Sequence, residues 1–143
     1  MKLNYCIALL TIVIFLACNT VQKAQTATTT PAPLAQPAFV SWDKKMIDLG
    51  QVKKGETREM FFEFTNTSGQ DIKIDIVDAC ECTKIDFPRG MIAPNGKGRL
   101  NAVFNSSEKD ADEKIGITIV FTNTDKNGNQ IIESVEYKFA LVK

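Results

Sequence analysis

The sequence predicts an all-β domain built as a sandwich of two sheets, and three observations point to it. Between residues 38 and 143, apolar and polar residues alternate with a period of two in seven short segments. Turn-forming pairs such as Asn127-Gly128 lie between these segments. No segment of useful length carries a helical period. Seven short strands with one polar face each are typical of an immunoglobulin-like (Ig-like) sandwich, and we expect that fold.

The first element is an export signal rather than part of the fold. Lys2 supplies a positive charge, and residues 5–17 form an uncharged run that is shorter than the roughly 20 residues a spanning helix needs. The run ends in Phe15-Leu16-Ala17-Cys18, which resembles a bacterial lipobox. The resemblance implies cleavage before Cys18 and attachment of a lipid to Cys18. We therefore expect a lipoprotein signal peptide over residues 1–17 and a membrane anchor through the N-terminal lipid.

A flexible linker follows over residues 18–37. It consists mostly of Thr, Ala, Gln and Pro, and Lys23 is its one charged residue. Such a segment buries too little apolar surface to offset the entropy of ordering it. Acidic residues, which mark some bacterial lipoproteins for transport to the cell exterior, do not occur between Cys18 and Asp43. We expect an outer-membrane protein that faces the periplasm, with the cell surface as the alternative.

The Ig-like domain then occupies residues 38–143. Its predicted strands span residues 39–42, 46–52, 57–65, 71–77, 99–104, 115–122 and 133–142. We expect the core face of each long strand to carry its apolar alternation, as in Met60-Phe62-Phe64, Ile72-Ile74-Ile76, Ile115-Ile117-Ile119-Phe121 and Val135-Tyr137-Phe139-Leu141. Phe61 faces away from this core stripe. We expect a loop to cover it, with an exposed contact patch as the alternative.

Four motifs in this domain resemble the bacterial domain-of-unknown-function family 1573. They are Ile47-Asp48-Leu49-Gly50-Gln51-Val52 with Lys54-Gly55-Glu56, Phe62-Glu63-Phe64-Thr65-Asn66-Thr67, Ala79-Cys80-Glu81-Cys82-Thr83, and Ile92-Ala93-Pro94-Asn95-Gly96-Lys97-Gly98. Glu81 and Asn95 each stand where the family pattern has Gly. The resemblance implies an Ig-like fold related to major sperm protein and Hydin-type modules, and secreted or lipid-anchored proteins. It implies no reaction.

Two of the four cysteines remain as candidates for chemistry, because Cys6 would be removed with the signal peptide and Cys18 would carry the lipid. Cys80 and Cys82 are separated by one residue, and an exported compartment permits their oxidation. In a regular strand their β-carbons would lie roughly 6–7 Å apart, too far for a disulfide, whereas a turn or bulge would let them close. Free thiols on one face could instead bind a soft metal ion such as Cu(I) or Zn(II). A local disulfide, thiol exchange and metal handling all stay open at this point.

Charge and composition exclude several other functions. Seventeen Lys and Arg residues balance seventeen Asp and Glu residues, which leaves no electrostatic footprint for nucleic acid. The chain has no histidine, which excludes Ser-His, Cys-His and His-metal sites. We therefore expect a non-catalytic, lipid-anchored module of the cell envelope, without a cofactor, that binds an envelope protein or forms a structural part. The alternative is a thiol-redox or soft-metal-handling lipoprotein that uses Cys80 and Cys82.

Overall fold

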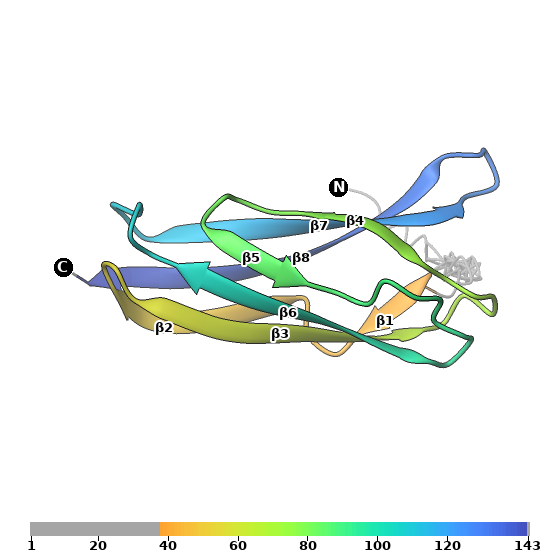
Figure 1. Ribbon diagram of the computed structural model, residues 1–143, viewed down its shortest axis with the longest axis horizontal. Helices are drawn as coiled ribbons and strands as arrows, with labels where there is room; N and C mark the ends of the chain where they lie inside the picture. The colour runs from red at the N-terminus through yellow and green to blue at the C-terminus, as the bar shows by residue number, and fades with distance from the viewer. Residues whose placement is uncertain (1–37, 143) are drawn as a thin grey trace, which may run out of the picture. The chain divides into compact units, whose positions relative to one another are not determined.

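The alternating segments form eight β-strands in the computed structural model, which describes residues 38–142 (Figure 1). The strands are β1 (Val40–Trp42), β2 (Met46–Lys53), β3 (Thr57–Asn66), β4 (Ile74–Asp78), β5 (Thr83–Asp86), β6 (Lys97–Asn105), β7 (Glu113–Thr124) and β8 (Gln130–Val142). The described residues contain no helix, and so none that could cross a membrane. The predicted signal peptide (1–17) and the predicted linker with its lipidated Cys18 (18–37) lie outside the described residues.

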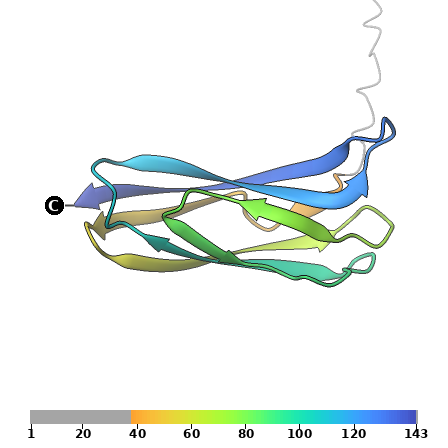
Figure 2. The same cartoon turned by 45° about the horizontal axis from the view of Figure 1, so that its top comes forward.

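The strands form two four-stranded sheets, which Figure 2 shows as two layers. One sheet has the order β1-β3-β6-β5, and the other has the order β2-β8-β7-β4. The chain changes sheets between β1 and β2, because β1 pairs antiparallel with β3 whereas β2 pairs parallel with β8. All other strand pairs are antiparallel. The all-β, Ig-like prediction is confirmed.

The apolar faces of the two sheets form one core between the layers. Phe64 of β3 meets Phe121 of β7 edge to face at 6.3 Å between ring centroids, and Phe104 of β6 meets Phe139 of β8 at 4.6 Å. Each of these rings is almost completely buried. Burial of such a side chain contributes roughly 1.5–3 kcal/mol, so the alternation read from the sequence is also the main source of stability.

Two details of the strand prediction are wrong. The sequence predicts seven strands, and the structure adds an eighth, β5, over Thr83–Asp86. The sequence also places Ile72, Ile74 and Ile76 on one face. Ile72 and Ile74 are buried, but Ile76 is 56% exposed, because the register of β4 against β7 shifts between Ile74 and Ile76. This bulge turns the rest of β4 over, since one extra residue exchanges the two faces of a strand.

A buried asparagine fastens the loops at one end of the sandwich. The Asn66 side-chain amide donates hydrogen bonds to the main-chain carbonyls of Gln70 (2.7 Å) and Ile92 (2.9 Å). Its carbonyl oxygen accepts hydrogen bonds from the main-chain N–H (3.0 Å) and the hydroxyl (2.7 Å) of Ser68. All the polar atoms of this fully buried side chain are therefore paired, as burial of a polar group requires.

Candidate functional site

The turn between β4 and β5 brings Cys80 and Cys82 together. The Thr83 N–H donates a hydrogen bond to the Cys80 carbonyl (2.9 Å), which closes a turn over Glu81 and Cys82. The two Cα atoms lie 5.1 Å apart, and the sulfur atoms form a disulfide. The segment is therefore a turn and not a regular strand, which is the geometry in which two cysteines of this spacing can bridge.

Two hydroxyl groups lie beside the disulfide. The Thr83 hydroxyl oxygen is 3.2 Å from the Cys80 sulfur and 3.6 Å from the Cys82 sulfur. The Tyr137 hydroxyl shares a 2.5 Å hydrogen bond with Thr83 and lies 3.9 Å from each sulfur. Burial raises the pKa of Tyr137 above its ordinary value, although the hydrogen bond with Thr83 lowers it. Tyr137 therefore stays protonated at neutral pH and is available as a hydrogen-bond donor.

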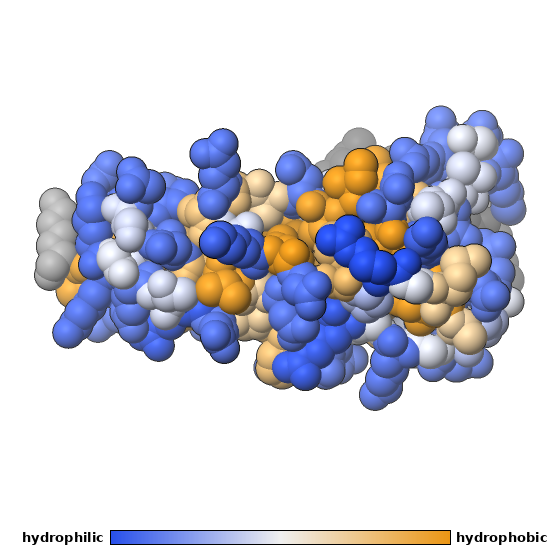
Figure 3. Space-filling view, in the orientation of Figure 1, coloured by the Kyte–Doolittle hydropathy of each residue, from blue (hydrophilic) through white to orange (hydrophobic). Residues whose placement is uncertain are grey.

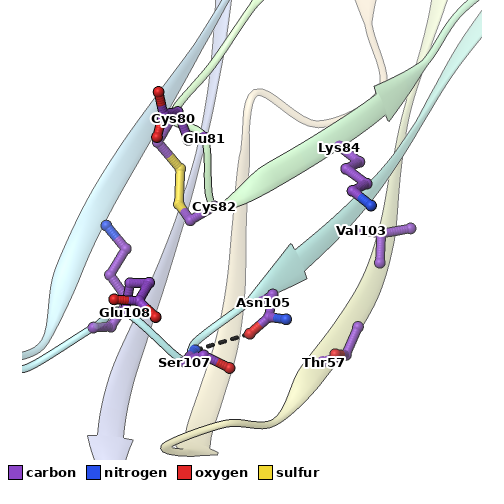
Figure 4. Close-up of a pocket in the computed structure, with 10 residues that line it drawn as sticks. Thr57, Cys80, Glu81, Cys82, Lys84, Val103, Asn105, Ser107 and Glu108 are labelled. Atoms are coloured by element: carbon purple, nitrogen blue, oxygen red, sulfur yellow. Dashed lines mark hydrogen bonds between the residues drawn. A yellow bond between two sulfur atoms is a disulfide. The ribbon is translucent and has the colours of Figure 1, made fainter.

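The disulfide forms one wall of a hollow of about 740 Å³ (Figure 4). The floor and rim come from the start of β3, from β5 and β6, and from the loop after β6. Besides Glu81 in the turn, the other lining residues are Thr57, Lys84, Val103, Asn105, Ser107, Glu108 and Lys109. Two acidic and two basic residues balance each other on this rim, and Lys109 is held by an ion pair with Glu113 (2.7 Å). The hollow has no dominant charge, so it is suited to a neutral or apolar group better than to an ion.

The closed disulfide between Cys80 and Cys82 determines which reactions this site can carry out. A disulfide can exchange with an incoming thiolate, but while it is closed it offers no thiolate to a metal ion. Within residues 38–142, no cluster of three or more His, Cys, Asp and Glu side chains is arranged to hold a metal. Of the alternatives left open by the sequence, the closed form shown here is compatible with a local structural bridge and with thiol exchange.

A second hollow, of about 440 Å³, lies between β2 and β3, and no motif in the sequence predicts it. Its lining residues are Asp43, Lys44, Ile47, Leu49, Glu59, Met60, Phe61 and Glu63. Ile47 and Leu49 of β2 face Met60 of β3 across an apolar floor, and the acids stand on the rim. Here the two sheets are open to solvent at their edge, because β1 pairs with only the last part of β3.

The open part of β3 exposes main-chain hydrogen-bonding groups. Pairing with β1 covers Phe64 to Asn66, and the Asp43 N–H still donates to the Glu63 carbonyl (2.9 Å). In an antiparallel ladder the residues that bond to one side alternate with those that bond to the other. Glu59, Phe61 and Glu63 follow one another at every second position, so their main-chain N–H and C=O groups all point to the side of β3 away from β6. Within residues 38–142, no strand bonds to those groups of Glu59 and Phe61.

Phe61 stands at the centre of this edge and is 48% exposed. The expectation that a loop covers it is wrong. Instead the guanidinium group of Arg99, from the neighbouring strand β6, lies 3.7 Å above the centre of the ring. The outward side of the ring remains available for contact with another molecule.

A third exposed feature is an apolar row on the outer face of the other sheet. Ile76 is opposite Val120, and Val120 is opposite Ile132, so three apolar side chains cross β4, β7 and β8. Ile76 is 56% and Ile132 is 61% exposed. Figure 3 shows apolar surface in patches among polar residues on the visible face of the domain. The row is small, and patches of this size are common on monomeric proteins.

Solved structures with this fold come from unrelated contexts. A protein of unknown function from Porphyromonas gingivalis matches with a TM-score of 0.58 and 19% identity, over 71% of this chain and 46% of that one. The PapD-like domain 7 of human CEP192 matches with a TM-score of 0.56 and 13% identity, over 78% of this chain and 92% of that one. The VesB protease of Vibrio cholerae matches with a TM-score of 0.58 and 10% identity, over 72% of this chain and 32% of that one.

These similarities show the fold alone, because the identities are low. The matched region is less than half the length of the Porphyromonas and Vibrio chains, so it corresponds to one part of each. No curated protein matches this chain in sequence. A family model does match it: the model of the protein family of unknown function DUF1573 covers residues 40–136. The chain therefore belongs to the DUF1573 family, as its four motifs predicted.

Proposed function

We propose that this protein is a non-catalytic module of the bacterial cell envelope, anchored by a lipid on Cys18, that works by binding another protein. The observation that carries the binding role is the open edge of β3, where unpaired main-chain groups lie beside an apolar hollow. Natural sheets usually protect such edges, because unpaired N–H and C=O groups recruit other strands. An edge that is left open is accordingly a place where a partner adds a strand.

The anchor and the linker support a role at a membrane surface. The lipobox-like residues 15–18 are followed by a segment that, fully extended, would reach up to about 60 Å. A domain on such a tether can meet partners held at some distance from the membrane. A Cys18→Ser variant tests the anchor: we expect it to leave the membrane fraction and to lack the lipid mass on its N-terminal peptide.

Site-specific photocrosslinking in intact cells tests the binding role. A photoreactive residue placed at Glu59, on the open edge, should yield one dominant crosslinked protein. A matched photoreactive residue at Lys126, an exposed position in the β7–β8 turn, serves as the control. Equal labelling from both positions, or no protein adduct from Glu59, would reject the proposal.

A second function, thiol–disulfide exchange, is supported by the hydroxyl groups beside the bridge. A thiolate of a dithiol partner would attack the Cys82 sulfur, form a mixed disulfide and release Cys80 as a thiolate. The Thr83 hydroxyl, which is 3.2 Å from the Cys80 sulfur, would donate a hydrogen bond to that thiolate. The partner's second thiolate then displaces Cys82, so the partner leaves oxidised and both cysteines are left reduced.

Redox titration of the full chain against glutathione distinguishes exchange from a structural bridge. If exchange is the function, the bridge opens in mild reductant, and Thr83→Val makes reduction less favourable by removing a donor to the thiolate. Thiol counting measures both effects. A bridge that resists mild reductant and is indifferent to Thr83→Val would leave a structural role only.

A further inference from the structure

We propose that the hollow beside the Cys80–Cys82 disulfide binds an extended polypeptide segment that carries a cysteine and, two positions away from it, an apolar residue. This substrate class rests on the proposed thiol–disulfide exchange and makes it specific. In the complete exchange, two thiols of the polypeptide become a disulfide, and Cys80 and Cys82 become thiols, so two electrons and two protons pass to this protein. The pairing of β5 with β6 places the disulfide in line with the groups that would hold such a segment.

Cys82 lies at the end of the outer face of the sheet that contains β5 and β6. Lys84 of β5 is directly opposite Val103 of β6 in an antiparallel pair. The Asn105 N–H donates a hydrogen bond to the Cys82 carbonyl (2.9 Å), which extends this register so that Cys82 is opposite Asn105. Because alternate residues of a strand point to the same face, Cys82 and Lys84 share the outer face with Asn105 and Val103.

Val103 is the apolar contact that this face offers to a bound segment. Residues two positions apart on a strand are separated by about 7 Å, and an extended peptide has the same repeat. A peptide that runs along β6 with its cysteine at Cys82 therefore places the residue two positions away over Val103. Val103 is 36% exposed, and among the described residues that line the hollow it is the one apolar side chain besides the two cysteines. An apolar peptide residue at this position buries that surface.

The charged groups beside Val103 suit the main chain of a polypeptide. Lys84 and Glu59 are each directly opposite Val103, on its two sides, and Glu59 also lines a neighbouring hollow of about 490 Å³ that shares Val103. Within residues 38–142, neither of them forms an ion pair. The ammonium group donates and the carboxylate accepts hydrogen bonds, and each peptide unit needs both kinds of partner. A small thiol such as mercaptoethanol has no groups that reach them.

The loop that lines the other part of the hollow is held in place before any substrate binds. The hydroxyl of the buried Ser106 lies within hydrogen-bond distance of the Lys53 carbonyl (2.7 Å) and the Glu56 carbonyl (3.0 Å). The Asn105 side-chain carbonyl accepts a hydrogen bond from the Ser107 N–H (2.8 Å), as Figure 4 shows. A preformed site loses less entropy on binding than one that must be ordered. The volume of about 740 Å³ also exceeds what a single thiol side chain fills.

Two capped peptides of the same composition test this specificity on the full-length chain in detergent. The probe is Val-Ser-Cys-Ser-Val, and the control is Ser-Val-Cys-Val-Ser. Both have the same order of residues in either direction, so no direction of binding is assumed. In an extended peptide, the Val residues lie on the same face as the cysteine in the probe and on the opposite face in the control.

The measured quantity is the rate at which each peptide opens the Cys80–Cys82 bridge. Acid quenching, alkylation of the new thiols and mass spectrometry count the intact bridge, the mixed disulfide and the dithiol. Each rate is divided by the rate of the same peptide with a small aliphatic disulfide, which corrects for the reactivity of its thiol. We expect the corrected rate of the probe to be roughly fivefold higher than that of the control, because only the probe contacts Val103.

A pair of variants tests the role of Val103. Val103→Thr keeps the shape of the side chain but removes apolar surface, so the ratio of probe rate to control rate should fall roughly threefold. Val120→Thr is the matched control, because Val120 lies on the outer face of the other sheet, where it is opposite Ile132. The ratio should stay as in the wild type for this variant. Urea denaturation shows whether both variants are folded.

The outcomes separate this specificity from thiol exchange itself. Equal corrected rates for the two peptides, or a ratio that Val103→Thr leaves unchanged, would reject recognition of the polypeptide. If mercaptoethanol and both peptides then open the bridge equally well, thiol exchange stands and only the substrate class is wrong. A corrected rate that is higher for mercaptoethanol than for the probe would assign the hollow to a small thiol. A bridge that stays closed with every thiol would reject both the exchange and its substrate.

Discussion

Replacement of Gly98 by alanine tests how closely β6 and the core are packed. Gly98 lies in β6 directly opposite Phe64 of β3. A Cβ atom built on Gly98 would lie 2.2 Å from the ζ carbon of Phe64, and 2.5 and 2.8 Å from its two ε carbons. Real Cβ atoms essentially never approach other heavy atoms so closely. Either the ring or the strand must move.

The surroundings of Phe64 determine the magnitude. The ring is 1% exposed, and it packs against Trp42 at 4.9 Å and Phe121 at 6.3 Å between ring centroids. It therefore has no free space into which to turn. Overpacking of a tight core costs about 1–3 kcal/mol, and we expect Gly98→Ala to lie near the upper end. For a domain with a free energy of unfolding of about 5–15 kcal/mol, this is a large fraction of its stability.

Gly116 is the matched control. It also lies within a strand, β7, but a Cβ atom built there meets no other atom within 4 Å. Gly116→Ala should be neutral or stabilising by up to about 1 kcal/mol, because alanine restricts the unfolded chain. Urea denaturation of both variants measures the difference, and Phe64→Leu combined with Gly98→Ala should recover part of the loss. Equal stabilities of the two single variants would refute the packing argument.

Three further predictions concern stability. Cys80→Ala combined with Cys82→Ala should lower the free energy of unfolding by about 1.6 kcal/mol, the loop-entropy value for a three-residue loop, as measured in urea without reductant. Asn66→Ala should cost about 2–4 kcal/mol, since it leaves two loop carbonyls without their donor, and chemical denaturation against wild type measures this cost. Hydrogen bonds from the main-chain N–H groups of Asn129 and Asn127 hold the pKa of Asp125 below its ordinary value. The stability that Asp125 contributes is therefore complete above about pH 4 and is lost as the pH falls through the lower folded value, so Asp125→Asn should flatten the acid limb of a stability–pH curve.

The core of the sandwich could be predicted from the sequence because it depends on a local pattern. In β7 and β8 the alternation of apolar residues is regular, and the predicted inward residues Ile117 and Tyr137 are fully buried. Asn95 stands where the family pattern has Gly, and it adopts a φ of 62°. Asparagine tolerates this left-handed conformation better than most residues do, so the turn can form with Asn95 in place of Gly.

The remaining features depend on contacts that no local pattern encodes. β5 spans four residues around one half-buried apolar side chain, Ile85, which is too short an alternation to distinguish from a loop. The bulge that turns Ile76 outward arises in the pairing of β4 with β7. The open edge at Phe61 was also beyond prediction, because side-chain alternation shows which face of a strand is buried and not which edge is paired.

The parallel pairing of β2 with β8 has a mechanical consequence. Six residue pairs join the two strands, from Met46 opposite Glu136 to Lys53 opposite Val142. A force applied to the chain before Val40 acts first on β1, and once β1 has separated from β3 it acts on β2 from its first residue. A force on the C-terminal side acts on β8 from its last residue. Because the strands run in the same direction, these two forces slide one strand along the other. The inter-strand bonds then carry the force together instead of opening one after another, so the domain resists extension along this axis.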